Sequence, residues 1–231
     1  MKIFLFLLLT NFCIAQNNKL IVTYGLVFQD DELLSDNSSV FKVHLDYAIA
    51  NPNRFLFDLN IDDKGYLFEL KNKLSTSEKN LSDDMAFIFA KYPGLIFSVN
   101  GEILKQSSLL GNKVFVKSEM INGWKLTEES KKIDGFLCYK ATNVDRVVND
   151  IKVFEHPIIA WYCPELPYNY GPIGYGNLPG LILELQVRNT VYGALKLDFN
   201  SEKLPDYDIL KKSEIISKEE EKKRLKVFFQ N

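Results

Sequence analysis

Apolar and polar residues alternate along many short stretches of this chain, as they do in β-strands with one buried face. Tight polar connections separate several of these stretches, and Asn100-Gly101 is the strongest short hairpin signal among them. The spacing favours antiparallel pairing, because no regular helical crossovers lie between the stretches. Strands are predicted at 20–28, 54–61, 66–74, 95–99, 102–108, 113–119, 136–142, 153–163, 181–187 and 191–199.

Helical signals are fewer than strand signals. One helix is predicted at 82–91, with acidic residues in its first turn, and another at 217–228, which opens with a capping box. Residues 40–50 fit either a strand or a helix. Their alternation favours a strand, while a preceding serine could cap a helix. We therefore expect a mainly β (α+β) fold. It would be an antiparallel sheet of about 9–10 strands, as a curved half-barrel or sandwich, with about two or three helices including a C-terminal one.

The N-terminus has the three parts of a secretory signal peptide. Lys2 supplies the positive charge, residues 3–9 are an unbroken apolar run, and Ala15 offers a small residue for cleavage. The run is too short for a membrane span, which takes roughly 20 residues. We expect a signal peptide at 1–15, export to the periplasm or the cell exterior, and one β-rich domain at 16–231 without a transmembrane segment.

Charge and motifs exclude several classes of function. The 30 acidic residues slightly exceed the 28 basic ones, so no basic excess points to nucleic acid. The sequence contains no phosphate loop, dinucleotide-binding turn, nucleophile elbow or zinc-protease motif, and His44 and His156 lack metal-ligand spacing. We expect no cofactor, no metal and no catalytic residue. A hydrolase site assembled from distant carboxylates or a histidine stays open as an alternative.

Two cysteines remain after the predicted signal peptide, Cys138 and Cys163. An oxidising compartment would allow them to form a disulfide. Such a bond would close a loop of about 25 residues and contribute about 3 kcal/mol of stability. Two buried free thiols, each packing as a small apolar side chain, are the alternative.

Proline, glycine and tyrosine are concentrated at 164–179, which we call the 164–179 loop. Proline removes backbone donors, so this segment is neither a regular helix nor a central strand. Its aromatic content also argues against a disordered linker. We expect an ordered loop of about 17 residues that either covers the edge of the core or borders a binding site. Its candidate binding residues are Tyr168, Tyr170 and Tyr175.

The end of this loop resembles a family signature. The segment Asn177-Leu178-Pro179-Gly180-Leu181-Ile182 is similar to the signature of the GLPGLI family, exported proteins of Gram-negative bacteria whose function is unknown. The stretches at 124–133, 135–141 and 160–172 resemble the motifs that precede it, so the similarity covers roughly 122–231. The resemblance implies no activity and no catalytic residue.

One residue departs from the signature, since Asn177 stands where the family has its first glycine. Asparagine is the non-glycine residue that best tolerates a positive φ, so we expect the fold to accept it. Pro179-Gly180 reads as a turn that directs the next strand. Leu181, Leu183 and Leu185 should then share one face, opposite Ile182 and Glu184.

The leading functional hypothesis is a non-enzymatic exported protein of the cell envelope that binds a ligand or partner at the 164–179 loop. An apolar ligand or another envelope protein would be its partner. The alternatives are a hydrolase or peptidase with a site built from distant residues, and a structural subunit of an envelope assembly.

Overall fold

The structure is a computed structural model that describes residues 19–29, 40–72, 80–107, 109–111, 113–148 and 153–230. Within these residues, twelve strands form one continuous sheet. The predicted signal peptide at 1–15, and the predicted strand ends at 73–74 and 108, lie outside these residues. The strands are β1 (Leu20–Phe28), β2 (Phe57–Asp62), β3 (Gly65–Leu70), β4 (Ile96–Val99), β5 (Glu102–Gln106), β6 (Val114–Ser118), β7 (Lys125–Ile133), β8 (Phe136–Val148), β9 (Val153–Cys163), β10 (Leu181–Val187), β11 (Thr190–Asp198) and β12 (Glu214–Ile216).

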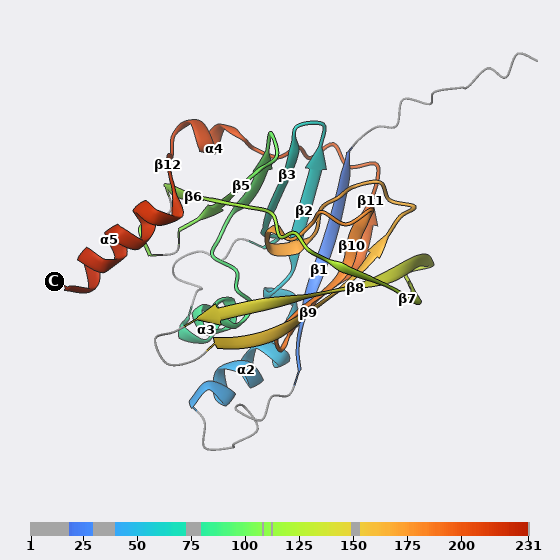
Figure 1. The fold of residues 1–231 in the computed structure, drawn as a ribbon, viewed down its shortest axis with the longest axis horizontal. Coiled ribbons are helices and arrows are strands. Elements are labelled where there is room, and N and C mark those ends of the chain that lie inside the picture. Colours follow the sequence, from blue (N-terminus) through green and yellow to red (C-terminus); the bar gives the residue numbers. More distant parts are fainter. Residues whose placement is uncertain are drawn as a thin grey trace, which may run out of the picture.

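The strand order across the sheet is β12-β6-β5-β4-β3-β2-β1-β11-β10-β9-β8-β7. All neighbouring pairs are antiparallel except β12 with β6, which run parallel. The sheet is open and strongly twisted, so that β8 and β9 cross the direction of β2 and β3 in Figure 1. The mainly β prediction is confirmed, with one curved sheet instead of a sandwich and with more strands than expected.

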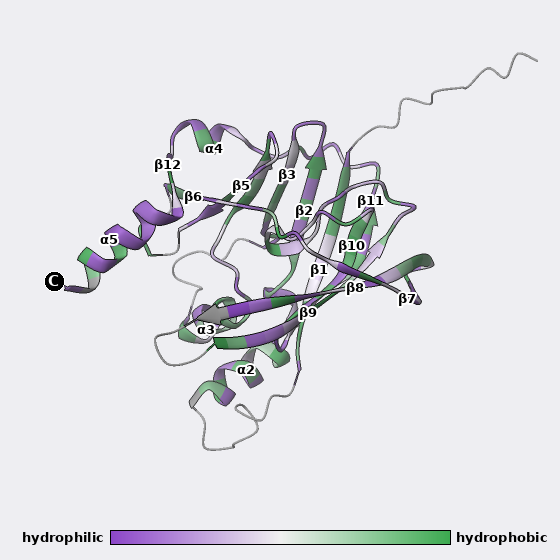
Figure 2. Cartoon of the chain, in the orientation of Figure 1, coloured by the Kyte–Doolittle hydropathy of each residue, from purple (hydrophilic) through white to green (hydrophobic). Residues whose placement is uncertain are grey.

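The helices lie in two places, one pair at the end of the sheet near β8 and β9 and one pair beside its β12 edge (Figure 1). The described residues form four α-helices, and α5 is mostly hydrophilic with apolar residues near its C-terminal end (Figure 2). No described helix has the length and apolar character needed to span a bilayer. The helices are α2 (Val40–Ala50), α3 (Leu81–Phe89), α4 (Asp208–Lys211) and α5 (Lys218–Gln230), with the short 3₁₀ helices η1 (Pro52–Arg54) and η2 (Pro172–Gly174).

Residues 40–50, which the sequence left open, are helical. Leu45 and Ala48 are three positions apart and both are buried, so they give α2 an apolar side that strand alternation did not reveal. The predicted helix at 82–91 begins one residue earlier, because Asn80 caps α3 in a reciprocal capping box with Asp83. The backbone N–H of Glu220 donates to the Ser217 hydroxyl over 3.1 Å, which confirms the predicted cap of α5.

The main core lies on the inner face of the sheet, which carries Tyr24, Phe57 and Phe68. The rings of Phe57 and Phe68 stack at 5.4 Å. The buried Tyr192 on β11 donates a hydrogen bond to the carbonyl of Ala90 at the end of α3, over 2.7 Å. This bond ties the helical layer to the sheet, and the 164–179 loop packs on the same face.

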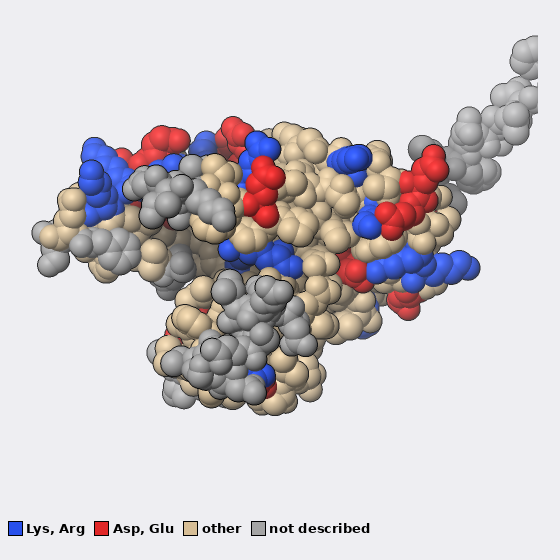
Figure 3. All heavy atoms as spheres, turned by 60° about the horizontal axis from the view of Figure 1, so that its bottom comes forward, with Lys and Arg blue, Asp and Glu red and all other residues tan. Residues whose placement is uncertain are grey.

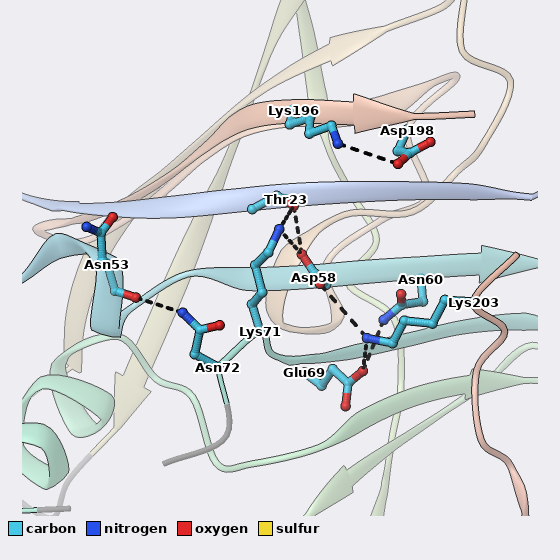
Figure 4. Close-up of polar contacts among 10 residues, drawn as sticks. All are labelled: Thr23, Asn53, Asp58, Asn60, Glu69, Lys71, Asn72, Lys196, Asp198 and Lys203. Atoms are coloured by element: carbon cyan, nitrogen blue, oxygen red, sulfur yellow. Dashed lines mark hydrogen bonds and ion pairs between the residues drawn. The ribbon is translucent and has the colours of Figure 1, made fainter. Parts of the chain in front are cut away.

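The opposite, outer face is partly polar. Asp58 on β2 and Glu69 on β3 are direct cross-strand partners, and both are buried. Thr23 donates to Asp58 over 2.7 Å, and the Lys71 ammonium lies 2.9 Å from the Thr23 hydroxyl (Figure 4). Lys203 lies 2.8 Å from Glu69, so two lysines balance the two carboxylates. A second apolar cluster beside this network is made of Leu67, Phe97, Leu104 and Phe115.

Candidate functional site

The 164–179 loop is ordered and is fixed to its surroundings by backbone hydrogen bonds. The N–H of Ile182 donates to Tyr170, and the N–H of Asn177 donates to Asn169, each over 3.0 Å. The indole N–H of Trp124 donates to the carbonyl of Gly176 over 2.8 Å. These bonds hold the loop against the inner face of the sheet, and the prediction of an ordered loop is confirmed.

The signature segment has the backbone geometry that its residue types suggest. Asn177 has φ of 60°, so asparagine does occupy a left-handed position here. Its side-chain amide donates to the side-chain oxygen of Asn122 over 2.8 Å. Gly180 has φ of 148°, and a Cβ on it would lie only 2.1 Å from the carbonyl oxygen of Cys163. The segment is therefore a tight corner between the loop and β10.

The predicted alternation along β10 is wrong, because a register shift lies between Ile182 and Glu184. Ile182 pairs with Tyr162 and Leu185 pairs with Ala160. Because Ala160 and Tyr162 are two residues apart on β9, Ile182 and Leu185 share a face. Leu181, Leu183 and Leu185 therefore do not form one uninterrupted apolar row opposite Ile182.

The three candidate tyrosines have different surroundings. Tyr170 lines a pocket, and its ring lies edge-on to that of the buried Tyr66, with centroids 4.9 Å apart. Tyr175 instead packs beside Trp124, at 6.4 Å between centroids, and burial raises its pKa to about 12. Tyr168 is half-buried against the core, and burial raises its pKa as well. Of the three, Tyr170 alone lines the pocket.

This pocket, with a volume of about 710 Å³, lies where four segments meet. They are the turn between β4 and β5, the chain around the end of β6, the 164–179 loop and the start of α5. An ion pair of 3.0 Å joins Lys117 to Glu102 at its wall. Its lining is mostly polar: Ser98, Gly101, Glu102, Lys117, Ser118, Glu119, Met120, Asn122, Asn169, Tyr170, Asn177, Ser217, Lys218 and Glu219.

Sequence reasoning found only the loop side of this pocket. The Asn100-Gly101 turn and the Ser217 cap were recognised as local features, but their meeting depends on sheet order, which no local pattern encodes. The parallel pairing of β12 with β6 carries the start of α5 to the pocket.

The two histidines lie elsewhere. His44 on α2 is hydrogen-bonded to the Ser82 hydroxyl over 2.9 Å, and His156 on β9 stacks on Phe154 with centroids 6.5 Å apart. Neither belongs to the pocket lining. The described residues contain no group of three or more histidine, cysteine or acidic side chains placed to hold a metal ion.

Cys138 and Cys163 are both buried and both are free thiols in this structure. The pairing of Tyr139 with Tyr162 brings the two cysteines to neighbouring positions on β8 and β9. Burial, together with the adjacent Cys163, raises the pKa of the Cys138 thiol to about 12. The predicted disulfide stays a prediction, but its two residues are now known to be neighbours.

Comparisons with known proteins give a fold and a short family match. A family described as "Protein of unknown function (Porph_ging)" matches residues 148–184, a stretch that includes the loop and the signature segment. No curated protein matches. Two structures of PNGF-II, in space groups C2 and P21, have TM-scores of 0.53 and 0.51 with identities of 18% and 17%.

The PNGF-II similarity covers 87% and 89% of this chain but only 31% and 32% of the PNGF-II chains. This chain therefore spans about a third of the length of those proteins. At such identities the similarity concerns the fold alone. Together the comparisons describe a mainly β protein that shares a fold with part of PNGF-II and a sequence stretch with a family of unknown function.

Proposed function

We propose that this chain is an exported cell-envelope protein of the GLPGLI family, and that it binds a polar ligand in the pocket beside the 164–179 loop. The observation that carries the proposal is the convergence of the loop, the β4–β5 turn and the start of α5 on one pocket. Ligand sites are typically concave, largely preformed and bordered by loops on a rigid scaffold.

The loop meets the requirement for a preformed site. Backbone bonds fix Asn169 and Tyr170 on its pocket side, and Asn177 is anchored through Asn122. A ligand would then bind without the entropy cost of ordering the loop. The loop's ring contacts and its bond from Trp124 also contribute to folding, so its structural and binding roles coexist.

The lining favours a polar ligand over the apolar one expected from sequence. Amides, hydroxyls and charged groups outnumber apolar side chains, with Tyr170 and Met120 as the large exceptions. Such a lining can orient a ligand through hydrogen bonds while Tyr170 offers a ring surface.

The hydrolase alternative has weaker support. No histidine lines the pocket, and the Glu102 carboxylate is already paired with Lys117.

Filling the pocket from its rim tests the proposal. Asn169→Trp adds an indole at an exposed lining position, and Glu165→Trp adds the same group at an exposed loop position outside the lining. A thermal-shift screen of small polar compounds should find stabilisers of the wild type and of Glu165→Trp that fail with Asn169→Trp. Compounds that stabilise all three proteins equally would overturn the proposal.

A further inference from the structure

The charged groups in the pocket wall have both signs. The wall holds the carboxylates of Glu102, Glu119 and Glu219 and the ammonium groups of Lys117 and Lys218. Lys117 and Glu102 pair at 3.0 Å, so these two groups largely cancel each other's charge. Figure 3 shows a similar mixture on one face of the molecule, where basic and acidic side chains lie among uncharged residues. A strongly anionic or strongly cationic ligand would therefore meet groups of its own sign in this wall.

Uncharged polar groups come from several of the segments that line the pocket. The 164–179 loop supplies Asn169 and Asn177, the chain at and after the end of β6 supplies Ser118 and Asn122, and β4 supplies Ser98. Asn177 and Asn122 hold each other through the bond between their side-chain amides. The Asn169 amide is exposed and makes no hydrogen bond with the described residues. Its donor and its acceptor are therefore both available to a ligand.

One aromatic ring forms part of the same wall. Tyr170 is half-buried, and its ring lies edge-on to that of the buried Tyr66, with centroids 4.9 Å apart. Tyr66 on β3 pairs directly with Ser98 on β4, which also lines the pocket. Two paired strands of the sheet thus support the Tyr170 ring, so the pocket combines a positioned ring surface with polar groups around it.

A neutral sugar is the class of ligand that matches this lining. Each sugar hydroxyl donates and accepts, so one hydroxyl can bond to a carboxylate and to an amide N–H at once. The C–H face of a sugar ring is apolar and packs on an aromatic ring. A neutral sugar also avoids the charge conflict that an ion would meet. The pocket volume of about 710 Å³ lies within the range of small-molecule sites and suits a short oligosaccharide.

We propose that the pocket binds a neutral oligosaccharide, with one sugar ring packed on Tyr170 and its hydroxyl groups bonded to Asn169 and to other polar groups of the lining. The inference rests on the proposed binding function and names the ligand class of that pocket. Glu119 and Glu219 make no ion pair or side-chain hydrogen bond with the described residues. Their carboxylates are therefore available to accept from sugar hydroxyls.

The test titrates three neutral tetrasaccharides, cellotetraose, maltotetraose and tetra-N-acetylchitotetraose, into the protein by calorimetry. At least one of them should bind the wild type. Asn169→Ala should weaken that binding by at least about tenfold, because it removes a donor and an acceptor on which no described contact of the fold depends. Asn200→Ala, at an exposed position after β11 and outside the lining, is the matched control and should bind like the wild type.

Two substitutions at Tyr170 separate the ring from its hydroxyl. Tyr170→Phe keeps the ring and should bind the tetrasaccharide within about threefold of the wild type, whereas Tyr170→Ala should bind it at least about tenfold more weakly. Melting temperatures show whether each variant is folded. If Tyr170→Ala is unfolded, Asn169→Ala decides the test, because its side chain contributes no described hydrogen bond to the fold.

Citrate and spermidine are the anionic and cationic probes. If one of them binds more tightly than every tetrasaccharide, and Asn169→Trp blocks it, the pocket function stands and the sugar assignment is wrong. Tetrasaccharide binding that Asn169→Ala and Tyr170→Ala leave unchanged would also overturn the sugar assignment. If no tetrasaccharide binds, the sugar assignment is wrong, and the compound screen with Asn169→Trp and Glu165→Trp decides separately on the pocket function.

Discussion

The carbonyl oxygen of Cys163 lies 2.1 Å from the point that a Cβ on Gly180 would occupy. The end of β9 and the start of β10 approach so closely there that only glycine fits. Its φ of 148° is a second requirement for glycine at the same position. The signature segment therefore builds a corner that the fold needs, and the polar pocket begins on the loop before it.

The first prediction concerns this corner. Gly180→Ala should lower the free energy of unfolding by about 2–4 kcal/mol, because the added methyl meets backbone atoms and the φ is strained. Gly193→Ala is the control, since an added Cβ there has no heavy atom within 4 Å. Urea unfolding should show a change below about 1 kcal/mol for the control. Losses of equal size in the two variants would contradict the role of Gly180.

The second prediction concerns the outer face. Lys203→Met should destabilise the protein by about 1–3 kcal/mol, because it leaves the buried Glu69 with less compensation opposite Asp58. Lys196→Met removes a lysine whose partner, Asp198, lies on the exposed part of the same face (Figure 4). That control should change stability by less than about 1 kcal/mol. Denaturant midpoints check both, and a larger loss in the control would rule out the proposed role of Lys203.

The third prediction is a pH dependence at Asp145. Burial alone would raise its pKa, but the hydrogen bonds and charges of Lys91 and Arg188 hold it below the usual value. A carboxyl with a depressed folded pKa stabilises the protein above its unfolded pKa of about 3.9, and the effect is lost as the pH falls through the folded value. The cost of Asp145→Asn should therefore be larger at pH 7 than near pH 3. Unfolding curves at the two pH values measure it, and an unchanged cost would argue against the ion-paired state.

The fourth prediction concerns the neighbouring thiols. In the reduced protein, burial and a pKa of about 12 leave Cys138 almost without thiolate at neutral pH. A thiol reagent should label the native reduced protein slowly and both cysteines quickly in urea. Rapid labelling of the native protein would contradict their burial. Peptide mapping without reductant, on protein isolated from the cells that make it, decides whether Cys138 and Cys163 form a disulfide.

Local patterns predicted most of the sheet but not its two edges. Strand β7 carries charged residues on both faces, as exposed edge strands do, so it shows no apolar alternation. Strand β12 has only three residues, which are too few to show an alternation of apolar and polar positions. Helix α2 has no decisive local signal, because Leu45 and Ala48 become a recognisable apolar side only against the rest of the fold. The register shift between Ile182 and Glu184 is not marked by any residue type that would predict it.

The candidate site was predictable only from the loop side. Composition marked the 164–179 loop as ordered and aromatic, and one of its tyrosines, Tyr170, lines the pocket. Tyr175 packs beside Trp124 instead. Residue type does not set the direction of a side chain in an irregular loop, so the sequence could not distinguish these two tyrosines. The start of α5 also lines the pocket, although it is far from the loop in sequence. Its position there is a property of the sheet order.

The most direct measurement is native mass spectrometry of the protein isolated from the cells that make it, with Asn169→Trp and Glu165→Trp beside the wild type. We expect a non-covalently bound polar species on the wild type and on Glu165→Trp. It should be absent from Asn169→Trp, whose indole fills the pocket. The same species retained equally by all three proteins would contradict the assignment of this pocket as the binding site.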